Sequence, residues 1–101
     1  MVAAGPGSYG KPRPALVMQS DFFDALASLT VLPLTSTLVD LPLLRVPVEP
    51  TPENGLRQPS QVMVDKVFTV RRASLGPRIG RLEGGALSLV DAALARFLGL
   101  A

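Results

Sequence analysis

The sequence predicts an α+β domain, mainly β, in which several short strands form a small, strongly bent barrel and one α-helix closes the chain. Three observations support this fold class. Short aliphatic runs are broken by 10 prolines and 9 glycines in 101 residues, as in folds of short strands joined by sharp turns. Residues 61–70 alternate between two faces, as a strand does. Residues 83–98 change to helical spacing.

The first two strands are expected where apolar runs adjoin prolines. Residues 15–19 (ALVMQ) follow Pro14, and residues 29–34 (LTVLPL) repeat the pattern. Both runs are continuous rather than alternating, which is typical of buried strands. Pro33 has no backbone N–H, so the second strand is expected to be an edge strand or bulged at that residue.

Residues 21–27, between these two runs, are expected to form a turn of helix capped by Ser20 or Asp21. Three large apolar side chains in this segment are expected to pack on the edge of the sheet. They are Phe22, Phe23 and Leu26.

A hairpin is expected next, because residues 43–48 and 61–70 are strand-like and enclose a turn-rich loop at 49–55 with Asn54-Gly55 at its tip. Residues 79–82 are expected to form a short last strand. The helix of residues 83–98 carries its apolar side chains at helical spacing and ends before Gly99. Its apolar face is expected to contain Leu87, Val90, Ala93, Leu94, Phe97 and Leu98.

Length and composition predict a single domain spanning residues 1–101, because a chain this short cannot bury two cores. The chain has no Cys and no His, which excludes disulfides, thiolate metal sites and the usual zinc ligand. No apolar run reaches the roughly 20 residues that span a bilayer, and the first residues lack the pattern of a secretory signal. We therefore expect a cytoplasmic protein with no membrane partner, metal or cofactor.

Charge is distributed unevenly along the chain. Residues 1–50 hold three cations against four anions, whereas residues 51–101 hold seven against four. A basic second half can bind a nucleic acid or another acidic partner, although most such surpluses are solvated surface.

Arg13 lies between Pro12 and Pro14, at the start of an expected strand. The two prolines restrict the backbone on both sides, which lowers the entropy lost in aiming the guanidinium. A guanidinium can hold two phosphoryl oxygens and stabilise charge that builds on phosphorus. RNA supplies its own nucleophile, the 2′-OH, so a site for RNA cleavage needs positive charge more than it needs a metal. From the residues alone, an arginine on a solvated strand start is the more common case.

Four blocks of the sequence, taken in order, resemble the MazF/PemK family of toxins from toxin–antitoxin systems. The blocks are GKPRPALVMQSD at 10–21, TVLPLTS at 30–36, ENGLRQPSQVMVDKVFTV at 53–70, and IGRL at 79–82 followed by a helix that ends in FLGL. The resemblance implies an SH3-like barrel that forms a two-fold homodimer. It implies a sequence-selective, metal-independent endoribonuclease that cleaves single-stranded RNA and is neutralised by a cognate antitoxin. Operator DNA is then expected to bind only through the antitoxin complex.

The resemblance also assigns site residues. Arg13 matches the family's catalytic arginine, Thr35 matches the threonine beside it, and Asp65 matches an aspartate proposed as an acid/base group in some members. Further candidates for RNA contact are Tyr9, Lys11, Gln19, Ser20 and Ser36. For Gln19 and Ser20, ordering of the following turn is at least as good an interpretation.

The chain departs from the family pattern at three places. Met63 replaces an arginine two positions before Asp65, which removes a charged partner from that carboxylate. Phe68 stands where an arginine is more usual, and packing in the core is preferred over base stacking for it. The chain reaches Tyr9 after only eight residues, so the first strand is expected to be shortened.

Three other functions stay open at this point. A related barrel family poisons DNA gyrase but lacks the Pro-Arg-Pro block. The shortened first strand and Met63 also leave open a catalytically inactive binding module. A purely structural barrel is the third alternative.

Overall fold

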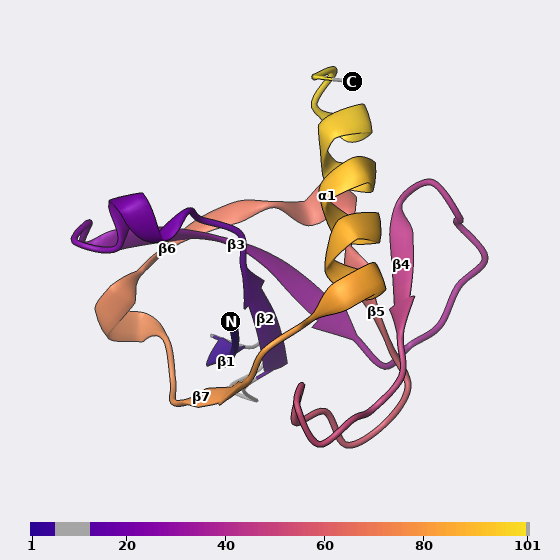
Figure 1. Cartoon of the computed structure of the whole chain (residues 1–101), viewed down its shortest axis with the longest axis horizontal. Helices are drawn as coiled ribbons and strands as arrows, with labels where there is room; N and C mark the ends of the chain where they lie inside the picture. The colour runs from indigo at the N-terminus through magenta and orange to yellow at the C-terminus, as the bar shows by residue number, and fades with distance from the viewer. Residues whose placement is uncertain (6–12, 101) are drawn as a thin grey trace.

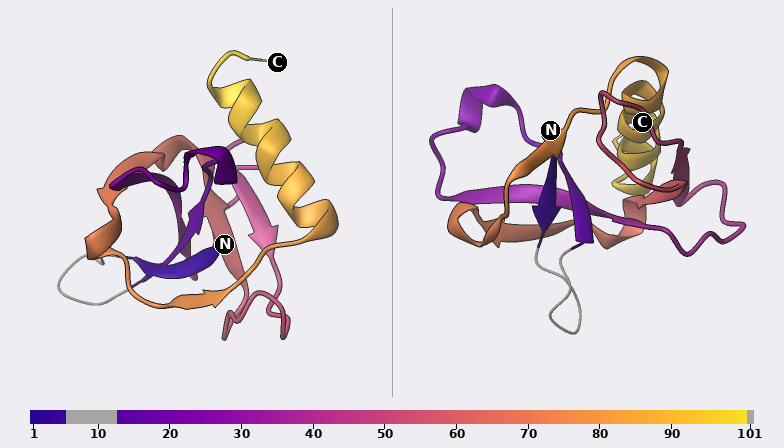
Figure 2. Two further views of the ribbon diagram at one scale, coloured as in Figure 1. Left: turned by 60° about the vertical axis from the view of Figure 1, so that its left-hand side comes forward. Right: turned by 90° about the horizontal axis from the view of Figure 1, so that it is seen from below.

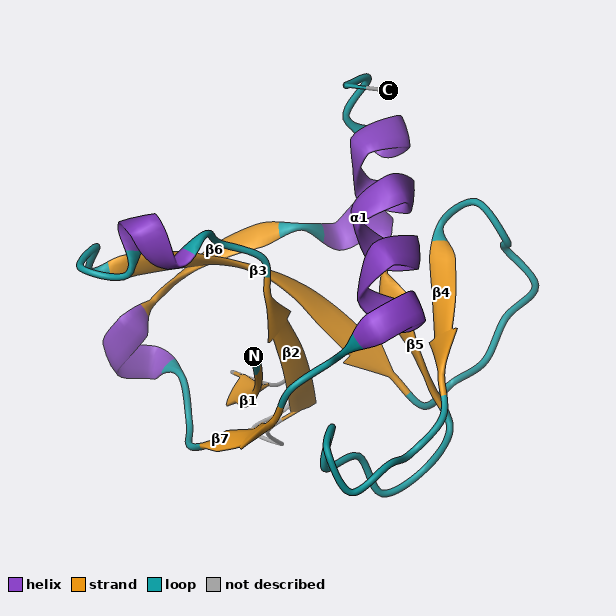
Figure 3. Ribbon diagram, viewed as in Figure 1, coloured by secondary structure: helices purple, strands orange, loops and turns teal. Residues whose placement is uncertain are grey.

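The computed structural model describes residues 1–5 and 13–100, which form a bent antiparallel sheet with a single α-helix beside it (Figure 1). The strands are β1 (Val2–Gly5), β2 (Arg13–Val17), β3 (Ser28–Thr35), β4 (Arg45–Val48), β5 (Ser60–Met63), β6 (Phe68–Arg71) and β7 (Arg78–Gly80). The helix α1 spans Gly84–Phe97. Among the described residues, the connections contain the 3-10 helices η2 (Asp21–Phe23), η3 (Val64–Lys66) and η4 (Arg72–Ser74) (Figure 3).

The strand order is β4-β5-β3-β2-β1-β7, and every pairing is antiparallel. The eight-residue strand β3 lies at the bend, because its first half pairs with β6 and its end pairs with β5. Within the described residues no pairing joins β7 to β4 or β6, so the sheet is strongly curved but not closed. The predicted α+β class, mainly β with a C-terminal helix, is confirmed.

Pro33 does not lie on an edge strand. On one side of β3, Pro33 is opposite Ala15 of β2. On the other side, β3 pairs with β6 up to Val31 and with β5 from Leu34 onward, so Pro33 lies between these two pairings. The ladder on that side of β3 is already interrupted where its partner changes. A residue without a backbone N–H is tolerated at this break, although β3 is central to the sheet.

The segment after β2 was expected to cover the sheet edge, and this expectation is wrong. The short helix η2 forms as predicted, with the Ser20 hydroxyl accepting from the Phe22 N–H at 3.2 Å. However, Phe22 is 86% exposed, and Phe23 and Leu26 are also exposed. The segment extends outward from the sheet (Figure 1), because polar contacts rather than apolar packing hold it.

The predicted continuous strand over residues 61–70 is also wrong, because η3 separates β5 from β6. β5 pairs with β4 and the end of β3, whereas β6 pairs with the beginning of β3. A single extended segment cannot reach both sets of partners, so the chain turns between them. The alternation still places Val62, Val64 and Val70 in the interior.

The hairpin between β4 and β5 is confirmed, but Asn54-Gly55 is not a solvent-exposed tip. Asn54 is buried, and Gly55 has φ 69°, a left-handed conformation that favours glycine. The connecting loop folds back against β7 instead of projecting into solvent.

The main core lies between the curved sheet and α1. It contains Leu16, Leu32, Leu34, Val62, Val64, Val90 and Ala93. Burial of each of these leucine and valine side chains contributes roughly 1.5–3 kcal/mol. Leu87 and Leu94 pack against this core as predicted, whereas Phe97 and Leu98 at the end of α1 are exposed.

The first strand, β1, is four residues long and pairs with β2 on one side and β7 on the other. Figure 2 shows β1 lying beside these two strands. Val2 and Ala3 are almost fully buried. β1 therefore supports β2, whose first residue is Arg13.

Candidate functional site

Arg13 and Thr35 come together through the pairing of β2 with β3. Leu16 is opposite Leu32 and Ala15 is opposite Pro33. The same register, extended by two residues, places Arg13 opposite Thr35, and both residues line the same two hollows of the surface. The expected partnership of these residues therefore has a structural basis in a strand register.

The Thr35 side chain has a defined orientation. Its hydroxyl oxygen accepts a hydrogen bond from the backbone N–H of Thr37 at 3.0 Å. A hydroxyl carries one donor as well as its acceptor lone pairs, so the O–H of Thr35 is left to donate. The residue can thus donate a hydrogen bond to an anionic oxygen near Arg13.

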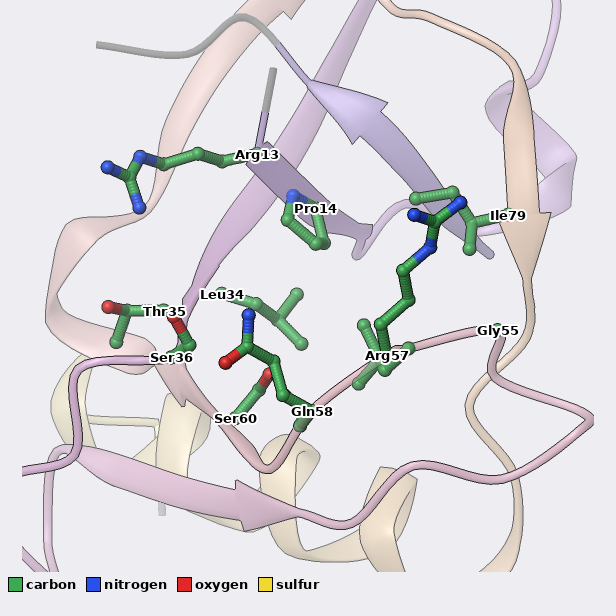
Figure 4. Close-up of a pocket in the computed structure, with 11 residues that line it drawn as sticks. Arg13, Pro14, Leu34, Thr35, Ser36, Gly55, Arg57, Gln58, Ser60 and Ile79 are labelled. Carbon is green, nitrogen blue, oxygen red and sulfur yellow. The ribbon is translucent and has the colours of Figure 1, made fainter. Parts of the chain in front are cut away.

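The first hollow is a groove of about 490 Å³ between β2, β3 and the loop that precedes β5 (Figure 4). Apolar side chains, including Pro14, Leu34 and Ile79, contribute one part of its lining. Polar side chains contribute the remainder, and these are Arg13, Thr35, Ser36, Arg57, Gln58 and Ser60. We call this hollow the loop-side groove.

The second hollow has a volume of about 520 Å³ and shares Arg13, Pro14, Leu34 and Thr35 with the first. Its other lining residues include Met63, Lys66 and Phe68. We call it the turn-side groove, because η3 borders it. Arg13 and Thr35 therefore lie where the two grooves meet.

The charge of both grooves suits a polyanion. Arg13, Arg57 and Lys66 line them, and no carboxylate is among their described lining residues. Neither Arg13 nor Arg57 forms a salt bridge with a carboxylate of the described chain. Such uncompensated cations raise the local concentration of anions and contribute salt-sensitive binding to phosphates.

Asp65 is not among the lining residues of either groove. Its carboxylate accepts a hydrogen bond from the Arg45 guanidinium at 2.6 Å and lies 3.6 Å from Lys66 Nζ. Partial burial acts to raise the pKa of the Asp65 carboxyl, but the hydrogen bond and charge of Arg45 outweigh it and hold that pKa below its ordinary value. Asp65 is therefore ionised near neutral pH.

Arg45 supplies the charged partner that was expected to be missing because of Met63. It lies directly opposite Met63 in the pairing of β4 with β5, and its side chain is only 11% exposed. Sequence reasoning missed Arg45 because it is 20 positions away from Asp65. The pattern Leu44-Arg45-Val46, with a charge inside a buried strand, was the available signal.

Gln19 and Ser20 have structural partners and line neither groove. The Gln19 carboxamide accepts from the Thr30 N–H at 3.1 Å and donates to the Phe23 carbonyl at 3.1 Å. Ser20 caps η2. Both therefore order the segment between β2 and β3, which was the alternative interpretation of these residues.

Phe68 was expected in the core, but it is 37% exposed and lines the turn-side groove. Its neighbour in sequence Val67 packs against the core instead, because η3 shifts the alternation by changing the backbone direction. Ser36, a candidate for RNA contact, lines the loop-side groove. Tyr9 and Lys11 lie outside the described residues.

Sequence reasoning missed Arg57, Gln58 and Ile79 as groove residues. Arg57 and Gln58 are exposed polar residues in a loop, a composition shared by many surface loops. Ile79 was assigned to the last strand without a role at the site. The short stretch Leu56-Arg57-Gln58 inside the third matching block was the available signal.

In the described part of the chain, no group of three or more Asp or Glu residues is placed to hold a metal ion. The described chain also contains no helix that is long and apolar enough to cross a membrane.

Two comparisons of sequence identify curated relatives. The chain is 53% identical over 100 residues to a probable endoribonuclease MazF of Mycolicibacterium smegmatis, covering 98% of this chain and 92% of the relative. It is 37% identical over 90 residues to endoribonuclease MazF3 of Mycobacterium tuberculosis, covering 88% of this chain and 81% of the relative.

Solved structures agree with this assignment. The fold matches the Mycobacterium tuberculosis toxin MazF-mt6 with a TM-score of 0.84 at 30% identity, covering 99% of this chain and 97% of that one. It also matches a mycobacterial endoribonuclease solved in complex with its cognate antitoxin, with a TM-score of 0.79 at 25% identity over 99% of this chain and 92% of that one. The sequence profile of the PemK-like, MazF-like toxins of type II toxin–antitoxin systems matches residues 2–98, and the chain belongs to this family.

Proposed function

We propose that this toxin is an endoribonuclease that cleaves single-stranded RNA where its two grooves meet, with Arg13 and Thr35 as the catalytic pair. The endoribonuclease activity is supported by the 53% identity with a relative named for it. The observation that carries the proposed site is that Arg13 and Thr35 are the two polar residues among the four described residues, with Pro14 and Leu34, that line both cationic grooves. The β2–β3 register, extended by two residues, supports this pairing.

The proposed reaction uses the RNA as its own nucleophile. The 2′-oxygen attacks the adjacent phosphorus and loses its proton, and the bond from phosphorus to the 5′-oxygen breaks. The products carry a 2′,3′-cyclic phosphate and a free 5′-hydroxyl. Negative charge builds on the phosphoryl oxygens in the pentacovalent transition state, where a fixed cation stabilises it most.

Arg13 is proposed to bind these oxygens through its guanidinium and to relay to the leaving 5′-oxygen the proton that the 2′-oxygen loses, so that the guanidinium ends the step with its charge unchanged. Thr35 is proposed to donate its hydroxyl to the same phosphate, since its oxygen is already oriented by Thr37. Asp65 is in the carboxylate form, which has no proton to donate. Asp65 also lines neither groove, so we assign it an anchoring role for η3, through its ion pair with Arg45, in place of an acid/base role.

Membership of the toxin family also supports proposals about the partners of this protein. We propose that a cognate antitoxin neutralises the toxin, as in the antitoxin complex of the matching mycobacterial endoribonuclease. We also propose a homodimer, binding of operator DNA only through the antitoxin complex, and action in the cytoplasm, where the RNA substrate is found.

The test is cleavage of a mixed RNA by the purified protein in the presence of EDTA. We expect the parent protein to cleave and Arg13→Ala to lose cleavage, while Arg96→Ala, which removes an exposed cation of α1, cleaves like the parent. DNA breaks that depend on gyrase, without loss of RNA, would favour a gyrase poison instead, an alternative that the comparisons do not favour. A folded parent protein that neither cleaves RNA nor arrests growth would indicate an inactive binding module.

A further inference from the structure

The loop that connects β4 to β5 places two polar residues, Arg57 and Gln58, in the groove that contains Arg13 and Thr35. In Figure 4 the Gln58 carboxamide points toward the middle of the groove, and Arg57 lies on the opposite side from Arg13. Both side chains are exposed, and neither has a hydrogen-bond or salt-bridge partner in the described chain. Both are therefore available to a ligand.

This loop is internally ordered around one buried side chain. Asn54 is 3% exposed, and its Oδ1 accepts from the backbone N–H groups of Thr51 at 3.0 Å and Leu56 at 2.9 Å. Its Nδ2 donates to the Glu49 carbonyl at 2.9 Å. A hydrogen-bonded buried amide of this kind fixes the backbone that precedes Arg57 and Gln58.

The loop is also fixed to β7. The Arg81 N–H donates to the Glu53 carbonyl at 2.8 Å. A Cβ on Gly80 would lie 2.3 Å from the same carbonyl oxygen, and a Cβ on Gly55 would lie 2.4 Å from the Ile79 carbonyl oxygen. The two backbones approach this closely only because both positions are glycine. The side chains of Arg57 and Gln58 thus extend from a rigid support, which a specific recognition site requires.

The loop-side groove combines an apolar lining with one amide. Pro14 and Ile79, which are half-buried, provide apolar surface on which a flat base can pack, and the Gln58 carboxamide offers a donor beside an acceptor. Proteins recognise unpaired RNA bases by this combination of packing and hydrogen bonds to a base edge.

We propose that Gln58 determines sequence selectivity by hydrogen-bonding the edge of the base that occupies the loop-side groove, and that Arg57 binds a neighbouring phosphate of the same strand. The base belongs to the nucleotide on one side of the scissile phosphate, because Arg13 and Thr35 border this groove. The inference rests on the proposed ribonuclease function and adds the determinant of base choice.

The test compares cleavage-site preferences of the parent, Gln58→Ala and Gln58→Glu on an RNA with a randomised segment. We expect Gln58→Ala to reduce the preference at one position next to the cleaved bond about tenfold, the loss expected for a bidentate base contact, with other positions unchanged. Glu at position 58 can only accept, so the preference there should move toward guanine, whose edge presents two adjacent N–H donors.

We compare the binding affinities of Arg57→Ala and Arg96→Ala for the same RNA. A 2′-deoxy substitution at the cleavage site keeps this RNA from being cleaved. Loss of a phosphate contact should weaken binding evenly across sequences and reduce the slope of log affinity against log salt by about 1. Arg96→Ala should change neither quantity. For any variant that does not cleave RNA, the base preference is taken from its relative binding affinities for the different sequences in this assay.

Two outcomes separate this inference from the proposed function. If the parent cleaves RNA with a defined preference and Gln58→Ala retains that preference at every position, the assignment of Gln58 is wrong and the function stands. If the parent does not cleave RNA, the proposed function itself is wrong. Thermal melts of each variant show whether it is folded. We expect no change for the Gln58 variants, since the Gln58 side chain contributes no hydrogen bond to the described fold and its backbone carbonyl, which accepts from Ser60 Oγ, is kept.

Discussion

The hydroxyl oxygen of Thr35 accepts a hydrogen bond from the backbone N–H of Thr37 at 3.0 Å, directly beside the position that the β2–β3 register gives to Arg13. This bond uses the oxygen as an acceptor and leaves the hydroxyl proton for another acceptor. A threonine in an ordinary turn would satisfy only the backbone, whereas this one also lines both grooves.

Thr35→Val is therefore expected to lower kcat/KM for RNA cleavage by about tenfold to a hundredfold, the range for a hydrogen bond to a charged group. Valine keeps the size and the β-branched shape but removes the donor. Thr35→Ser, which keeps the hydroxyl, should stay within about threefold of the parent. Equal kinetics for the Val and Ser variants would remove Thr35 from the mechanism.

The ion pair between Arg45 and Asp65 is expected to stabilise the fold and not to supply a catalytic proton. Asp65→Asn leaves the mostly buried guanidinium of Arg45 without its carboxylate, which should lower the free energy of unfolding by about 1–3 kcal/mol. Denaturant unfolding at neutral pH measures this. Cleavage by the folded fraction should remain within about threefold of the parent, because the residue lines neither groove.

The same ion pair predicts a dependence of stability on pH. The pKa of Asp65 is lower in the folded state than its ordinary value of 3.8, so the unfolded chain binds the proton more tightly. The contribution to stability is present above that ordinary pKa and is lost as pH falls through the lower folded-state pKa. Acid titration of the unfolding free energy should show this loss in the parent and not in Asp65→Asn.

Gly80→Ala is expected to damage the groove through the loop between β4 and β5. The added Cβ would lie 2.3 Å from the Glu53 carbonyl oxygen and 2.6 Å from the Asn54 carbonyl carbon, so the loop must move away from β7. We expect a lower melting temperature and lower cleavage. Gly85→Ala is the matched control, because nothing lies within 4 Å of the added atom. A Gly80→Ala protein as stable as the control would show that the loop does not depend on this close approach.

Much of the fold can be predicted from the sequence because its signals are local. The spacing of residues 83–98 indicates a helix close to Gly84–Phe97, and the aliphatic runs indicate β2 and β3 to within a few residues. The break at Val64–Lys66 cannot be predicted in this way. In the sequence the alternating pattern continues through these residues without a break, and only the distant partners of β5 and β6 show why the strand must turn.

The residues of the candidate site also fall into those that local motifs predict and those that only distant contacts reveal. Arg13 and Thr35 are found through motifs that match a family, and the structure supplies the register that joins them. Arg45, Arg57 and Gln58 depend on contacts between segments far apart in the chain, so no short pattern marks them. Asn54-Gly55 shows the same limit, since its composition indicates a turn but its burial depends on Gly80.

The most direct test of the central claim is single-turnover cleavage of one short RNA by the parent, Arg13→Ala and Arg13→Lys, with the end groups of the products determined. The account predicts a 2′,3′-cyclic phosphate and a 5′-hydroxyl, no cleavage when the 2′-OH is replaced by hydrogen, and a loss of about 10²–10³ in rate for Arg13→Ala. Lysine lacks the bidentate fork and should restore only part of that loss. A folded Arg13→Ala protein that cleaves within twofold of the parent would contradict the account.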